Sequence, residues 1–110
     1  MGNLDRVRLL RKFIDLEQEN PFNYYALALE LRESDPLETV ELFDFLLENH
    51  PGYLPVYFTA AHFFTEQNQL LKAKQLFEKG IELAQSQNEE KALRELKNAF
   101  QNFLFENDLD

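Results

Sequence analysis

Residues 57–77 read YFTAAHFFTEQNQLLKAKQLF, and this stretch decides the fold. Ala61 and Ala73 stand within helical stripes of aromatic and aliphatic residues, where larger apolar side chains would remove more surface from water. The distance between two antiparallel helices is set by the side chains at their closest approach, and an axial distance near about 8 Å needs small residues there. The stretch therefore predicts two helices that pack closely at Ala61 and Ala73.

Proline and polar turns cut the rest of the chain into segments of similar length. Proline breaks a helix interior but is tolerated in the first turn, where a preceding Asp or Asn can cap the helix. Within the segments, apolar residues recur at helical spacing, and the short connections favour antiparallel neighbours. We predict six helices, at residues 4–18, 21–33, 36–49, 54–67, 70–85 and 88–106.

A pattern of small and aromatic residues recurs after 33 residues, which calls for a test of repeat architecture. The pattern resembles the tetratricopeptide repeat, whose signature is W-x2-L-G-x2-Y, then A-x3-F-x2-A, then P. In the second unit, the matching residues are Tyr57, Ala60, Ala61, Phe64, Ala73, Phe77 and Gly80. In the first unit they are Tyr24, Leu27, Ala28, Leu31, Thr39, Phe43, Leu46 and Pro51.

The resemblance implies an all-α fold, a short right-handed α-solenoid of antiparallel helix pairs with about six helices. It covers almost the whole chain, as one domain of residues 1–110. The expected parts are an N-terminal half unit at 4–19, a first repeat at 21–51, a second repeat at 54–86 and a C-terminal capping helix at 88–106.

The two ends of the chain depart from the full repeat. Leu9, Phe13 and Leu16 have the spacing of a second helix, without a first helix before them. On the last helix, Lys97 stands where a small residue belongs, which is reasonable if no further helix packs over it.

The first helices of stacked pairs are expected to line a concave face. The resemblance implies that side chains next to their buried stripes hold an extended or helical peptide of a partner protein. The alternative for Tyr25 and Phe58 is packing against neighbouring helices. The expected groove residues are Tyr25, Leu29, Arg32 and Glu33, then Phe58, His62, Thr65 and Glu66, then Arg94, Asn98, Gln101 and Asn102.

Charge and composition narrow the partner and the location. The net charge is -9, although residues 1–12 hold four basic groups against Asp5. An acidic surface repels phosphate backbones, so we expect no nucleic acid, and a basic or neutral protein segment fits better. The chain has no cysteine, no signal peptide pattern and no apolar run long enough to span a membrane, so we expect a cytoplasmic protein without a membrane partner.

No residue pattern indicates catalysis or a cofactor. His62 and Glu66 lie at i, i+4, but such a lone pair is more often solvated than metal-bound, and we expect no metal site. No phosphate-binding loop, HExxH motif or catalytic triad pattern is present. The chain is therefore not expected to be an enzyme.

Two functions from different classes remain open. The first is a small adaptor that binds a partner peptide or helix in the concave groove, and the second is a structural module that self-associates through helix faces. Phe45 and Phe105 fall outside the expected apolar stripes, and either neighbouring helices cover them or a second protomer does, as in a homodimer.

Overall fold

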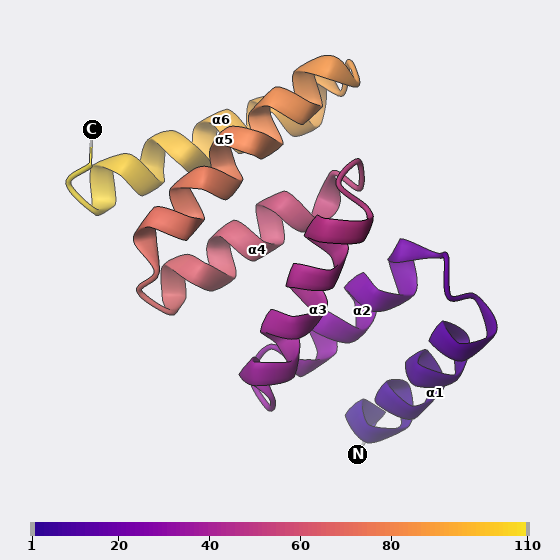
Figure 1. Cartoon of the computed structure of the whole chain (residues 1–110). Helices are drawn as coiled ribbons and strands as arrows, with labels where there is room; N and C mark the ends of the chain where they lie inside the picture. The colour runs from indigo at the N-terminus through magenta and orange to yellow at the C-terminus, as the bar shows by residue number, and fades with distance from the viewer. Residues whose placement is uncertain (1, 110) are drawn as a thin grey trace. The chain divides into compact units, whose positions relative to one another are not determined.

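The computed structural model describes residues 2–109, which contain six α-helices and no strand (Figure 1). The contacts divide the chain between Val56 and Tyr57 into two compact units, and each unit is described by itself. The prediction of six helices is confirmed. The helices are α1 (Gly2–Leu16), α2 (Pro21–Leu31), α3 (Pro36–Asn49), α4 (Pro55–Glu66), α5 (Leu70–Ser86) and α6 (Glu90–Glu106).

The starts of α2 and α3 follow the proline signals. The Asn20 side chain accepts a hydrogen bond from the Phe22 N–H at 3.0 Å, and the Asp35 carboxylate accepts one from the Glu38 N–H at 3.2 Å. In both helices proline occupies the first turn, where its missing N–H removes no intrahelical bond. Both boundaries are therefore set by the local sequence.

The three helices that end in the second unit share a left-handed terminal turn. Asn68, Asn88 and Asp108 have φ angles of 60°, 57° and 55°, a region that Asn and Asp tolerate better than most residues. The following N–H returns to a carbonyl five residues earlier, which is the Schellman arrangement of a helix C-terminus. These bonds join Gln69 to Phe64 at 2.8 Å, Glu89 to Ala84 at 3.0 Å and Leu109 to Leu104 at 2.8 Å.

Several helix boundaries differ from the expected ones. The last helix begins at Glu90 and not at 88, because Asn88 has a positive φ that a right-handed helix cannot include. The end of α4 at Glu66, one residue early, reflects the same type of turn at Asn68. The first helix lies at Gly2–Leu16 where we expected 4–18, and α2 ends at Leu31 where we expected 33.

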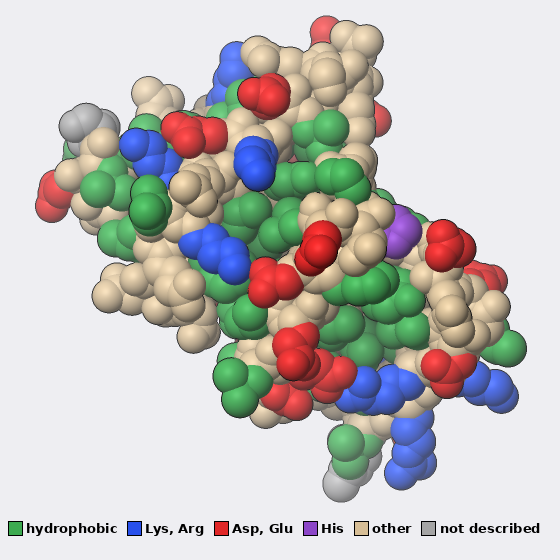
Figure 2. Space-filling view, viewed as in Figure 1, with side chains coloured by type: hydrophobic (Ala, Val, Ile, Leu, Met, Phe, Trp, Pro, Cys, Tyr) green, Lys and Arg blue, Asp and Glu red, His purple; other side chains and the backbone are tan. Residues whose placement is uncertain are grey.

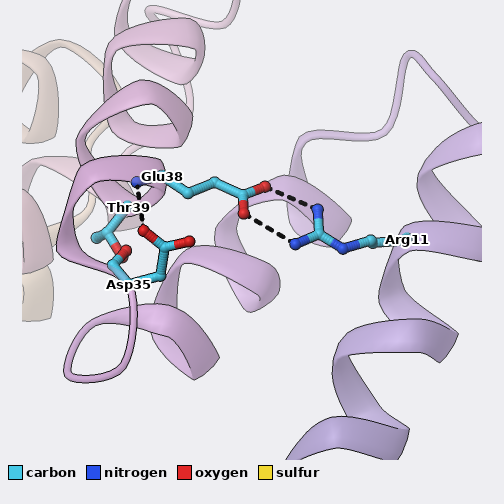
Figure 3. A network of polar contacts seen from close by, with 4 residues as sticks. All are labelled: Arg11, Asp35, Glu38 and Thr39. Atoms are coloured by element: carbon cyan, nitrogen blue, oxygen red, sulfur yellow. Dashed lines mark hydrogen bonds and ion pairs between the residues drawn. The ribbon is translucent and has the colours of Figure 1, made fainter.

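In the first unit, α1 packs on α2, and α2 packs on α3. Two ion pairs connect α1 to the other helices. Arg6 Nε lies 2.8 Å from Glu30 Oε1 on α2, and Arg11 donates bonds of 2.7 and 2.8 Å to both carboxylate oxygens of Glu38 on α3 (Figure 3). Such a two-bond pair fixes the orientation of both side chains. It also lowers the pKa of Glu38 and raises the pKa of Arg11.

In the second unit, α4, α5 and α6 meet at Gly80. A Cβ atom at this position would lie 2.9 Å from Tyr57 Cβ on α4 and 3.3 Å from Leu96 Cδ2 on α6. At the other end of α4, Lys72 Nζ stands 4.3 Å from the centre of the Phe64 ring. Because Tyr57 lies near Gly80 and Phe64 near Lys72, α4 and α5 run antiparallel.

The two alanines of the opening stretch are completely buried. The aromatic residues of the stretch are also buried, apart from Phe58, which is 38% accessible. Neither alanine faces solvent, which fits the prediction that they permit close packing. A close helix approach also lies at Gly80, where a Cβ atom would crowd Tyr57. One turn earlier on α5, the Phe77 ring is stacked on Phe100 and tilted against Phe103 of α6, with ring centres 5.5 and 5.2 Å away.

We expect Gly80→Ala to lower the free energy of unfolding by about 1 to 2 kcal/mol, because an overpacking cost of about 2 to 3 kcal/mol against Tyr57 exceeds the gain of about 1 kcal/mol in helix propensity. Urea denaturation of the variant and of Lys79→Ala, an exposed neighbour on the same helix, would measure this. The control should stay within about 0.5 kcal/mol of the wild type. Equal stability of Gly80→Ala and wild type would contradict the close approach.

A double-mutant cycle with Arg11→Gln and Glu38→Gln should give a coupling of about 0.5 to 1 kcal/mol at neutral pH. The pKa of Glu38 is lower in the folded state, so this contribution is complete above the unfolded pKa of about 4.3 and is lost as pH falls through the folded pKa. Thermal melts from pH 7 down to strongly acidic conditions would follow it. Replacing Glu41, an exposed acid on the same helix, is the control, and a coupling that persists after Glu38 is protonated would refute the assignment.

Candidate functional site

Two of the expected groove residues, Tyr25 and Leu29, line a groove of about 490 Å³ between α1 and α2. Both are half-buried. Tyr25 also lies edge-on to Tyr53, with ring centres 5.6 Å apart. Part of the Tyr25 ring is therefore used for packing within the first unit, and part remains available to a partner.

The groove is lined mainly by apolar side chains, and its charged residues are Arg6 and Glu30. The Arg6 and Glu30 ion pair spans α1 and α2 beside the apolar lining. Burial, with a smaller effect of Tyr25, raises the pKa of Tyr53, so this phenol stays neutral at physiological pH. Of the other expected residues on α2, Arg32 and Glu33 are exposed, and Arg32 Nε approaches the Leu29 carbonyl oxygen at 3.4 Å.

Sequence reasoning missed much of the groove lining. Besides Tyr25 and Leu29, it includes Phe22 and Ala26 of α2, and these four share one helix face. Their spacing of i, i+3, i+4 and i+7 is a signal in the sequence for this face. The repeat signature describes only the buried stripe and does not include them. The remaining lining residues are Arg6, Leu9 and Leu10 of α1, together with Glu30.

On α4, the structure brings Phe58 and His62 together. Their ring centres are 4.5 Å apart, and the His62 ring lies 5.7 Å from the buried Phe77 of α5. His62 is exposed, and 38% of the Phe58 surface is accessible although its neighbours on both sides pack inward or partly inward. The result is an aromatic surface held in place by the core of the second unit.

The remaining expected residues of the second unit are polar. The Thr65 hydroxyl donates to the Ala61 carbonyl at 2.8 Å and is half-buried, while Glu66 is exposed. On α6, Arg94, Asn98, Gln101 and Asn102 are all exposed. These residues give the α6 surface hydrogen-bonding and positive groups without an apolar anchor.

Phe45 and Phe105 have different surroundings. Phe45 is half-buried, with its ring 4.5 Å from Tyr24 and 6.1 Å from His50. Phe105, near the end of α6, keeps 74% of its surface accessible. Of the two residues considered for self-association, Phe105 offers the larger apolar area.

Within residues 2–109, no three His, Asp or Glu side chains are grouped so that they could hold a metal ion. His62 and Glu66 therefore have no third ligand among the described residues. None of the helices in this part of the chain has both the length and the apolar character required to cross a membrane.

Comparison with known proteins supports the repeat assignment. No known family profile and no curated protein sequence matches the chain. A solved structure does match: the solution NMR structure of a tetratricopeptide repeat domain protein from Salinibacter ruber is 30% identical, with a TM-score of 0.73. The match covers 77% of this chain and 87% of the other.

This similarity extends over more than two thirds of both chains and includes sequence as well as fold. It confirms the predicted all-α, tetratricopeptide-repeat-like fold class and agrees with the residue pattern of the two repeats. The chain belongs to the tetratricopeptide repeat family.

Proposed function

We propose that this chain is a protein-interaction adaptor. It binds a peptide or helix of a partner through exposed side chains on the first helix of each helix pair, which are α2, α4 and α6. The observation that carries the proposal is the aromatic surface of Phe58 and His62 on α4. Aromatic residues are enriched at interfaces, where they supply contact area at low cost in side-chain entropy. The core ring of Phe77 supports His62 and so preorganises the surface.

The same proposal includes Tyr25, Leu29 and Arg32 on the first unit, and Thr65, Glu66, Arg94 and Asn98 on the second. The acidic charge of the chain favours a basic or neutral partner segment and opposes nucleic acid. The proposal includes a non-catalytic role, a cytoplasmic location and no membrane partner. It also keeps residues 1–110 as one domain, with repeats at 21–51 and 54–86 between two half units at 4–19 and 88–106.

The first test is capture of the partner from lysate of the native cell, with tagged wild type and with Phe58→Ala. Loss of a partly buried aromatic anchor typically costs at least about 1.4 kcal/mol, so we expect the dissociation constant of the captured and purified partner to rise about tenfold or more. His62→Ala should weaken binding in the same direction. Circular dichroism should show that both variants keep the helical fold.

The matched control is Leu71→Ala, which changes an exposed apolar residue on α5 outside the proposed site. It should bind as the wild type does. Equal affinities for Phe58→Ala, His62→Ala and wild type would show that the partner does not bind to this surface.

The second candidate function is self-association, which the exposed Phe105 favours. If α6 faces associate, wild type should sediment as a dimer at micromolar concentration and Phe105→Glu as a monomer, because a buried carboxylate is strongly unfavourable. Phe45→Glu is less informative, since it also disturbs the packing on Tyr24. A monomeric wild type at all concentrations would exclude this function.

A further inference from the structure

The outer side of α1 carries apolar residues that the other described helices cover only in part, and Phe13 among them is 40% accessible. Leu9, Phe13 and Leu16 stand at i, i+4 and i+7, and Leu9 and Leu16 keep 50% and 70% of their surfaces accessible. The stripe that α1 uses for packing is a different one, formed by half-buried residues that include Leu10 and Ile14. A helix with apolar residues on two sides normally buries both of them.

This exposed stripe continues into the groove between α1 and α2. Leu9 belongs to both, and Phe22, which is 57% accessible, lines the groove from α2. The surface therefore combines a row of leucine and phenylalanine side chains with an adjoining concavity of about 490 Å³. An amphipathic helix binds to such a surface through anchors at i, i+3 or i+4 and i+7.

The charges around the stripe indicate which charge a binding helix should carry. Figure 2 shows Lys and Arg side chains gathered over α1, in contrast to the acidic remainder of the first unit. Arg6 and Arg11 are in ion pairs with Glu30 and Glu38. Arg8 and Lys12 lie one turn apart on the helix and have no ion-pair partner among residues 2–109.

We propose that the outer face of α1, defined by Leu9, Phe13, Leu16 and Phe22, is a docking site for an amphipathic helix of another protein with acidic residues beside its apolar stripe. The acidic residues pair with Arg8 and Lys12, while the apolar ones fill the groove. The site shares the groove of Tyr25 and Leu29 with the proposed adaptor surface, but its lining does not include Phe58 or His62.

The terminal helices of a second copy fit this face less well. Pairing α1 with α1 brings together two helices that each hold four basic residues against Asp5 and Asp15. The other terminal helix, α6, holds three basic and three acidic residues and exposes Lys97, so it offers no complementary charge. An amphipathic acidic helix from another protein can bury the apolar stripe and also form ion pairs with Arg8 and Lys12.

The test uses a fluorescein-labelled synthetic helix as long as α1, with leucines at i, i+4 and i+7 and glutamates beside them. Its twin has lysines in place of the glutamates. Fluorescence anisotropy with the full chain should show binding of the acidic helix at least tenfold tighter than of the basic one. Amide shifts in an NMR titration should concentrate on Leu9, Phe13, Leu16 and Phe22.

Leu16→Glu should weaken binding of the acidic helix tenfold or more, as should the double change Arg8→Glu with Lys12→Glu. All three positions are exposed, so the fold should persist by circular dichroism. The matched control is Leu71→Glu, an equally exposed leucine on α5, which should leave affinity unchanged. Phe58→Ala should also leave it unchanged, which distinguishes binding at this site from binding at Phe58 and His62.

Several outcomes would overturn the proposal. They are absence of binding at millimolar peptide, equal affinity for the acidic and basic helices, or shifts centred on Phe58 and His62. A wild-type dimer that Leu16→Glu dissociates would assign the face to a second copy. Binding of the chain to phosphatidylserine vesicles that Leu16→Glu abolishes would assign it to a membrane surface.

Discussion

The absence of a side chain at Gly80 allows three helices to meet at one point. Tyr57 of α4 and Leu96 of α6 both approach this backbone, at distances that a Cβ atom would violate or strain. This close approach sets the spacing at which Phe77 can contact His62 on one side and the rings of α6 on the other. The proposed aromatic surface therefore depends on a residue that does not itself reach solvent.

The same repeat position is occupied by Leu46 in the first unit, and this residue is also completely buried. Because a leucine side chain needs the volume that Gly80 leaves to its neighbours, we expect the helix packing of the first unit to be looser or shifted. At the position equivalent to Ala73, the first unit has Thr39, whose buried hydroxyl donates to the Asp35 carbonyl oxygen at 3.0 Å. The hydrogen bond makes burial of this polar group acceptable. The repeats thus share a pattern while differing in how it is packed.

The sequence was sufficient for the order and number of helices because the strongest signals are local. Proline after Asn20 or Asp35 restricts the backbone within a few residues, and the apolar spacing identifies the buried side of each helix. Helix ends were harder to predict, because a left-handed turn at Asn68 or Asn88 is one of several conformations open to asparagine. A Schellman turn is selected by the hydrogen bonds and packing that follow it, which a single sequence does not display.

The candidate site shows why the prediction of functional residues is less complete than the prediction of fold. Exposure of Phe58 beside His62 depends on the position of Phe77 on another helix, and the groove at Tyr25 needs α1 as its second wall. The spacing within one helix predicts that Phe58 and His62 share a flank, but it shows neither the contact of His62 with Phe77 nor the second wall of the groove.

The two ion pairs of α1 divide its basic residues into two groups. Arg6 and Arg11 attach the helix to α2 and α3, whereas Arg8 and Lys12 form no ion pair within the described chain. Four similar residues in the sequence thus have two different roles. The difference arises because Glu30 and Glu38 lie opposite only two of them, so the positive charge left on the outer face follows from tertiary packing and not from composition.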